Sequence, residues 1–142
     1  MVNVQGDFKE FIKFYQEGLI IHGSYWDHIK SSWAYKDHPN FLIIWFEEMK
    51  KNQRLVIDNV CKFVNCDLSE EKKTQLVEHL KFDNMKRNKS VNLEDVVLRG
   101  SFIRKGEVGD WKNHFDDHTK KKMDSWVKDN LENTTIPVQY YT

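Results

Sequence analysis

Apolar residues recur every three or four positions along most of the chain, which is the spacing of one face of an α-helix. Between Asp7 and Gly18 this stripe is complete, with Asp7 placed as the N-cap and Gly18 as the stop. Similar stripes predict further helices at 24–39, 48–64, 69–80, 82–86 and 116–131, three of which begin at a capping residue, Ser24, Ser69 or Asp116. We therefore expect a helix-rich protein.

One uninterrupted apolar run, Phe41–Phe46, follows Pro39 and Asn40. Such a run is typical of a strand buried on both faces of a parallel sheet, and the helix expected after it would complete a βα unit. A parallel strand needs neighbours for its backbone hydrogen bonds, yet no second strand pattern is evident. The predicted fold class is α/β with one strand at about 41–46, and residues 88–104 are expected to form a long loop.

The length and the charge of the chain limit its domain number and the kinds of partner it could attract. The 142 residues are of single-domain size, so we expect one domain over 1–142. Lysine and arginine together number 22, as do aspartate and glutamate, so no net charge attracts the chain to nucleic acid or to an anionic membrane. Any anion-binding site must therefore be local.

No apolar run approaches the roughly 18 residues of a membrane span, and the N-terminus lacks the pattern of a secretory signal. A cytoplasmic location is the default expectation. Cys61 and Cys66 lack the paired spacing of a zinc site, and His114 and His118 have no evident third ligand. We expect no metal.

The segment from Arg104 to Phe115, RKGEVGDWKNHF, is poorly suited to a helix or a strand. Its two glycines allow turns and can bring backbone N–H groups close to an anion. Arg104 offers a planar fork for paired phosphate oxygens, and Lys105 adds a compact ammonium beside it. The segment predicts an oxyanion clamp, whereas a solvated basic pair is the plainer interpretation of two adjacent cations.

The same segment, together with HGSYWDHI at 22–29 and FEEMK at 46–50, resembles the C-terminal half of the cytosolic sulfotransferases. Those enzymes transfer a sulfonate from 3′-phosphoadenosine 5′-phosphosulfate to a hydroxyl or amine of a small molecule. The resemblance runs from about residue 7 to residue 135. It implies that the chain is the helix-rich C-terminal portion of a P-loop-like fold with a parallel sheet. It also implies two partners, a nucleotide donor and a small-molecule acceptor.

The resemblance also implies roles for individual residues on the donor side of the site. It places Arg104, Lys105 and the backbone of Gly106 on the 3′-phosphate of the nucleotide. Phe102 and Ile103 would lie by the adenosine, with Ile103 where the family often has Met.

A second group of residues would lie near the adenine. Phe46 stands where the family commonly has Tyr, and Phe82 and Met85 match a Phe and a Met of its adenine-side segment. Lys81 takes the place of a family Ser and could replace that contact by charge, although Phe82 and Met85 are also ordinary core residues by pattern. His22 stands where many relatives have Tyr, at the border of the acceptor pocket.

The segment after the clamp departs from the family. Many relatives dimerise through a motif of which Lys112 and Phe115 remain, but Asp116 and Asp117 replace its Thr-Val, and Lys121 occupies its Glu position. We therefore do not expect the usual dimer contact, although Asp116 can cap the next helix as Thr would.

Family members carry the phosphosulfate loop and the catalytic histidine in their N-terminal half, and no Thr-Tyr-Pro-Lys-Ser-Gly-like stretch occurs in this sequence. The chain is expected to be a truncated C-terminal portion, with no catalytic residue and no activity by itself. Two alternatives stay open. One is a non-catalytic nucleotide-binding or regulatory protein that keeps the clamp, and the other is a helical interaction protein in which the clamp is vestigial.

Overall fold

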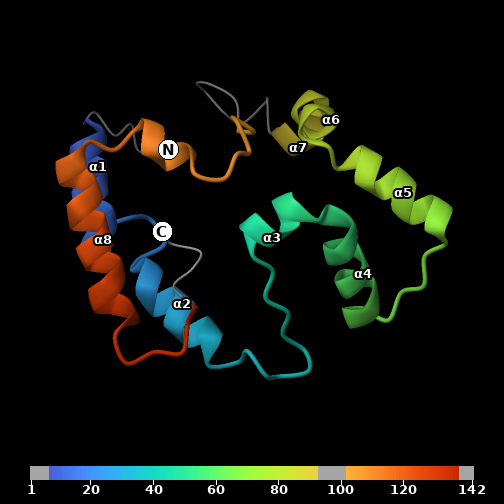
Figure 1. The fold of residues 1–142 in the computed structure, drawn as a ribbon, viewed down its shortest axis with the longest axis horizontal. Helices are drawn as coiled ribbons and strands as arrows, with labels where there is room; N and C mark the ends of the chain where they lie inside the picture. Colours follow the sequence, from blue (N-terminus) through green and yellow to red (C-terminus); the bar gives the residue numbers. More distant parts are fainter. Residues whose placement is uncertain (1–6, 93–101, 138–142) are drawn as a thin grey trace. The chain divides into compact units, whose positions relative to one another are not determined.

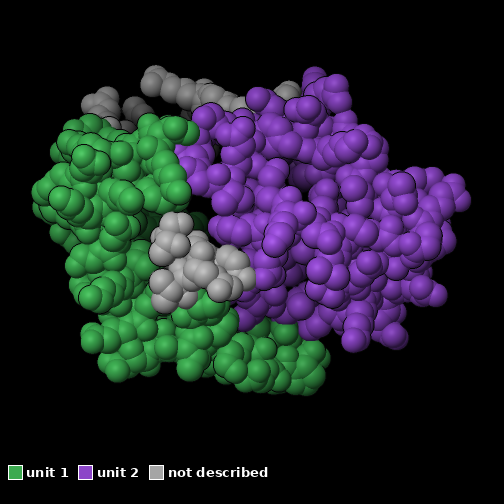
Figure 2. Space-filling view, in the orientation of Figure 1, with its two compact units in different colours: residues 1–41, 111–142 green, residues 42–110 purple. Residues whose placement is uncertain are grey.

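The computed structural model describes residues 7–92 and 102–137, and within these ranges all regular secondary structure is helical (Figure 1). The elements are α1 (Phe8–Gln16), α2 (Tyr25–Trp33), α3 (Phe46–Lys51), α4 (Gln53–Phe63), α5 (Glu70–His79), α6 (Phe82–Arg87), α7 (Lys89–Asn92), the 3₁₀ helix η1 (Asp110–Asn113) and α8 (Asp117–Leu131). None of the helices in the described ranges is long and apolar enough to cross a membrane. The chain divides into two compact units, residues 1–41 with 111–142, and residues 42–110 (Figure 2).

The first unit is built around aromatic side chains from α1, α2 and α8. Trp26 on α2 is only 2% exposed, and its ring centroid lies 5.4 Å from that of Trp126 on α8. Tyr15 on α1 lies 5.6 Å from Trp126 and 5.7 Å from Tyr25. Burial among these rings raises the pKa of Tyr15 to about 12, and the neighbouring Tyr25 adds to the effect. The neighbouring helices α1 and α2 thus share one aromatic core with α8, which is distant in sequence.

Local capping determines where two of these helices begin. The Asp7 carboxylate accepts a hydrogen bond from the backbone N–H of Glu10, whose side chain in turn accepts one from the backbone N–H of Asp7. Asp116 accepts from the backbone N–H of Thr119 at 2.7 Å, and Lys9 pairs with the same carboxylate at 2.8 Å. The expected caps of α1 and α8 are confirmed, and the ion pair joins α1 to the first turn of α8.

Acid is expected to weaken this first unit through Asp116. The hydrogen bond from Lys9, and those from Thr119, hold the pKa of Asp116 well below its usual range. A depressed pKa means that the stabilisation is complete above the unfolded value of about 3.9 and is lost as the pH falls towards the folded value. Asp116→Asn keeps a capping side chain but cannot titrate, so its free energy of unfolding should depend less on pH below about pH 4.

Urea unfolding at a series of pH values, followed by circular dichroism, measures this difference. Asp117→Asn, at the exposed neighbouring position, is the matched control and should keep the pH dependence of the unmutated chain. Identical acid profiles for Asp116→Asn and the unmutated chain would contradict the prediction.

The second unit contains α3 to α7 and corrects the expected strand. The apolar run 41–46 forms no strand: residues 41–45 have no regular structure, and Phe46 begins α3. Leu42 and Ile44 are 36% and 42% exposed, so the run is not buried on both faces. A strand requires a partner for its backbone ladder, and no strand lies elsewhere in residues 7–92 and 102–137. The expected βα unit is therefore absent from these residues.

The single helix expected over 48–64 is two helices, α3 and α4, separated at Asn52. The backbone of Asn52 has φ −149° and ψ 78°, outside the helical region, and its side chain accepts a hydrogen bond from the backbone N–H of Leu55 at 3.1 Å. Asn competes well for such capping contacts, which explains why the helix restarts here. The apolar residues keep their helical spacing on both sides of Asn52, so their periodicity does not indicate the break.

Most of the remaining helices agree with the sequence pattern, with shifted ends, but the 3₁₀ helix η1 (Asp110–Asn113) forms within the segment 104–115, which was expected to be poorly suited to a helix. Ser69 caps α5 and α6 forms where a short helix was expected, whereas α2 ends at Trp33, well before Pro39. The short helix α7 occupies the beginning of the expected loop at 88–104, and residues 93–101 of that loop lie outside the described residues.

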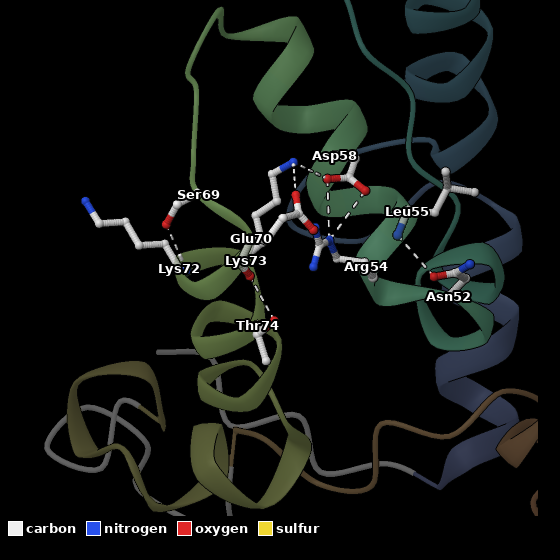
Figure 3. A network of polar contacts seen from close by, with 9 residues as sticks. All are labelled: Asn52, Arg54, Leu55, Asp58, Ser69, Glu70, Lys72, Lys73 and Thr74. Atoms are coloured by element: carbon white, nitrogen blue, oxygen red, sulfur yellow. Dashed lines mark hydrogen bonds and ion pairs between the residues drawn. The ribbon is translucent and has the colours of Figure 1, made fainter.

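An ion-pair network fastens α4 to α5 (Figure 3). Lys73 of α5 reaches Asp58 of α4 at 2.8 Å and Glu70 at 3.3 Å, while Arg54 of α4 pairs with both acids. Hydrogen bonds from Lys73 lower the pKa of Asp58, and those from Arg54 lower that of Glu70. A single ion pair near the surface adds little to the stability of the fold, but side chains that share partners in a network lose less conformational entropy for each pair that forms. The network sets the relation of two helices that contribute to the site described next.

Candidate functional site

A cavity of about 570 Å³ lies within the second unit. Its walls come from α3, the start of α4, the end of α5, α6 and the segment 102–106, and the residues that line it are Phe46, Met49, Lys50, Gln53, Leu80, Lys81, Phe82, Met85, Phe102, Ile103, Arg104 and Gly106. Gln53 also ties α4 to the end of α5, because its amide nitrogen donates to the carbonyl of Leu80 at 3.3 Å.

The lining is mainly apolar and aromatic, with three cations at Lys50, Lys81 and Arg104 and no acidic side chain. Lys81 also forms an ion pair with a residue that does not line the cavity, because its ammonium lies 2.5 Å from a carboxylate oxygen of Glu78. Ligand cavities of this size are typically apolar with a few convergent polar groups. An apolar wall with positive charge suits a ligand that combines a flat apolar ring system with anionic groups.

The two cations of the expected clamp share one buried carboxylate. A guanidinium nitrogen of Arg104 donates to Oδ2 of Asp110, and the ammonium of Lys105 donates to Oδ1 at 2.6 Å. The side chain of Asp110 is 7% exposed, whereas those of Arg104 and Lys105 are 59% and 44% exposed. The adjacent cations are therefore not simply solvated, as the plainer interpretation of the sequence supposed.

Gly106 brings the clamp backbone against α6. Its φ of 62° lies in the left-handed region, and a Cβ built there would stand 2.6 Å from a ring carbon of Phe82. The ammonium of Lys86 lies 5.8 Å from the centre of the same ring. Only a residue without a side chain permits this approach, so the glycine places the 102–106 segment against the aromatic wall of the cavity.

The nine residues expected to bind the nucleotide are brought together, because all of them except Lys105 line the cavity and Lys105 shares Asp110 with Arg104. His22, expected at the border of the acceptor pocket, is an exposed residue of the first unit and does not line this cavity. That these residues bind a nucleotide stays a prediction.

Four lining residues were not expected from the sequence: Met49, Lys50, Gln53 and Leu80. A signal for the first three was present, because with Phe46 they fall at i, i+3, i+4 and i+7, the spacing of one helix face. The prediction of a strand at 41–46 obscured this helical spacing, because it places Phe46 at the end of a strand, whereas Phe46 begins α3. Leu80 carries no such signal.

Comparison with known proteins identifies the family. The model of the sulfotransferase domain family matches residues 1–135. The chain belongs to the sulfotransferase family.

Among curated sulfotransferases, the luciferin sulfotransferase of Photinus pyralis is 34% identical over 93% of this chain and 38% of its own length. Sulfotransferase 1E1 of Bos taurus is 33% identical over 91% of this chain and 46% of its own length. The chain thus spans less than half the length of these curated relatives.

The fold resembles part of solved sulfotransferase-family structures. A crystal structure of retinol dehydratase in complex with retinol and PAP aligns with a TM-score of 0.89 and 36% identity, over 95% of this chain and 41% of that one. A second structure of retinol dehydratase, with androsterone and PAP, aligns with the same TM-score and 35% identity. The helical arrangement of this sulfotransferase chain therefore corresponds to a portion of the family fold.

Proposed function

We propose that the cavity of the second unit binds the 3′-phosphate and adenosine side of 3′-phosphoadenosine 5′-phosphosulfate. In this proposal the chain supplies one side of the donor site of an enzyme that transfers sulfonate to a hydroxyl or amine of a small molecule. The observation that carries the proposal is that Arg104 and Gly106 of the clamp line the same cavity as Phe46, Phe82 and Met85.

The residues present fit this nucleotide. Adenine is flat and apolar on its faces, and the cavity offers the aromatic rings of Phe46, Phe82 and Phe102. The 3′-phosphate is a compact anion, which suits the exposed donors of Arg104 and of the neighbouring Lys105. The retinol dehydratase structures that this chain resembles were solved with PAP, which supports the same ligand class here.

Binding and transfer are separate expectations. The bound nucleotide would supply the sulfonate, while the described residues would hold the end of the donor that does not react. The sequence contains no phosphosulfate loop of the family type, and no described residue of the cavity is a histidine positioned to take an acceptor proton. We therefore propose that the 142-residue chain binds the nucleotide without transferring sulfonate, and that its location is cytoplasmic, as the name of the Danio rerio relative cytosolic sulfotransferase 1 suggests.

Calorimetry with 3′-phosphoadenosine 5′-phosphate (PAP) tests the binding proposal. We expect one nucleotide bound per chain, with an affinity that decreases as salt is added, because phosphate contacts are screened. Adenosine 5′-monophosphate is the matched control ligand. It lacks the 3′-phosphate and with it the contacts to both Arg104 and Lys105, each worth about 1.5–3 kcal/mol, so it should bind about a hundredfold or more weakly.

Absence of PAP binding would overturn the proposal, and equal affinities for the two nucleotides would overturn the assignment of the clamp to the 3′-phosphate. The transfer proposal has its own measurement: with radiolabelled donor and a panel of phenols and alcohols, the purified chain should release no sulfonated product. Turnover by the chain alone would contradict it.

A further inference from the structure

The carboxylate of Asp110 is buried behind the two exposed cations of the clamp. Each of its oxygens accepts a hydrogen bond from a different cation, Oδ2 from Arg104 and Oδ1 from Lys105. Asp110 follows Gly109, whose φ of 82° turns the chain back, and it opens the 3₁₀ helix η1. The turn thus places the carboxylate of Asp110 next to Lys105 and Arg104, which precede it by five and six residues.

This arrangement leaves most of the cationic donors available to a ligand. A guanidinium carries five N–H groups and an ammonium three, and one carboxylate oxygen engages only part of each set. The side chains of Arg104 and Lys105 stay about half exposed, whereas that of Asp110 is nearly inaccessible. A buried acid that binds both cations restricts their rotamers, while about half of each cationic side chain stays exposed to solvent.

We propose that Asp110 is a positioning residue for nucleotide binding: it holds Arg104 and Lys105 side by side, so that the 3′-phosphate meets donors that are already ordered. This inference rests on the proposed function of the cavity. Long cationic side chains lose rotamer freedom when they bind, and a partner that orders them beforehand reduces that cost to affinity.

The direction in which Asp110→Asn changes PAP affinity distinguishes a positioning role from simple electrostatic repulsion. If Asp110 acted only as a competing anion, removing its charge would strengthen binding of the negatively charged nucleotide. Positioning predicts the opposite, and we expect Asp110→Asn to weaken PAP binding about tenfold, or about 1.4 kcal/mol. Glu107→Gln, an exposed acid of the same segment, is the matched control for the change in charge and should leave PAP affinity unchanged or slightly stronger.

The comparison of two nucleotides separates positioning from a general loss of structure. Calorimetry of Asp110→Asn should show weaker PAP binding and an unchanged affinity for adenosine 5′-monophosphate, because only the 3′-phosphate meets the clamp. Unchanged or stronger PAP binding, or an equal loss for both nucleotides, would overturn the role of Asp110 alone. Absence of PAP binding by the unmutated chain would instead overturn the proposed function, and this inference with it.

If Asp110→Asn does not fold, nuclear magnetic resonance of the unmutated chain decides. In the nucleotide-free protein, a guanidinium held by Asp110 should give Arg104 separate, slowly exchanging Nη proton signals at low temperature. A single averaged signal, as for a freely rotating guanidinium, would overturn the inference.

Discussion

Replacing Arg104 and Lys105 together by alanine is expected to weaken binding of PAP by about a hundredfold or more. Each cation would donate charge-assisted hydrogen bonds to the 3′-phosphate, and removing such a bond costs about 1.5–3 kcal/mol. The absence of both cations therefore corresponds to at least about 3 kcal/mol, or about a hundredfold in the dissociation constant. Calorimetry at one fixed salt concentration measures the difference, because the affinity for a phosphate depends on ionic strength.

The double variant Lys120→Ala with Lys121→Ala is the matched control. It removes the same charge from exposed positions on α8, in the other unit of the chain, and should leave the affinity nearly unchanged. An equal loss in both double variants would indicate diffuse attraction rather than a clamp. Because Arg104 and Lys105 both bind buried Asp110, thermal unfolding must accompany each titration to show that the variants are folded.

Gly106→Ala is expected to destabilise the second unit and to weaken PAP binding. Alanine at a φ of 62° costs about 1–2 kcal/mol from backbone strain. The added Cβ would also stand 2.6 Å from the ring of Phe82, closer than real Cβ contacts allow. Displacing the ring adds a cost of the kind seen on overpacking, about 1–3 kcal/mol, for a total of about 2–5 kcal/mol in the free energy of unfolding.

Gly109 offers a control for the strain alone. Its φ of 82° is also left-handed, but a Cβ there would meet no atom within 4 Å, so Gly109→Ala should cost only about 1–2 kcal/mol. In a Phe82→Leu background, the cost of Gly106→Ala should fall towards that of Gly109→Ala, because the ring that collides is gone. Urea unfolding measures all four variants. Equal costs for the two glycine variants in the unmutated background would show that the contact with Phe82 does not matter.

Most helices could be predicted because their signals are local. Asp7, Ser24, Ser69 and Asp116 each cap the helix that follows, through a side chain that reaches a backbone N–H three residues on. Such contacts depend only on neighbouring residues. The strand at 41–46 was wrong for the opposite reason: a strand is completed by another segment, and an apolar run does not show whether that segment is present.

The composition of the site was predictable in outline. Eight of the residues that line the cavity, among them Arg104, Gly106 and Phe82, were named from the family resemblance. Their neighbours on α3 and α4, Lys50 and Gln53 among them, were missed because the start of α3 was assigned to a strand.

The sequence alone determined the helix-rich character of the chain, the caps at Asp7, Ser24, Ser69 and Asp116, and the family resemblance, since periodicity, capping and motifs are read from nearby positions. It also predicted which residues would form the clamp. Only the tertiary structure decided how the clamp is built. It placed Asp110 behind Arg104 and Lys105 and set Phe82 against Gly106. These contacts depend on left-handed turns at Gly106 and Gly109 and on the packing of α6, and no spacing of residue types specifies which side chains such turns bring together.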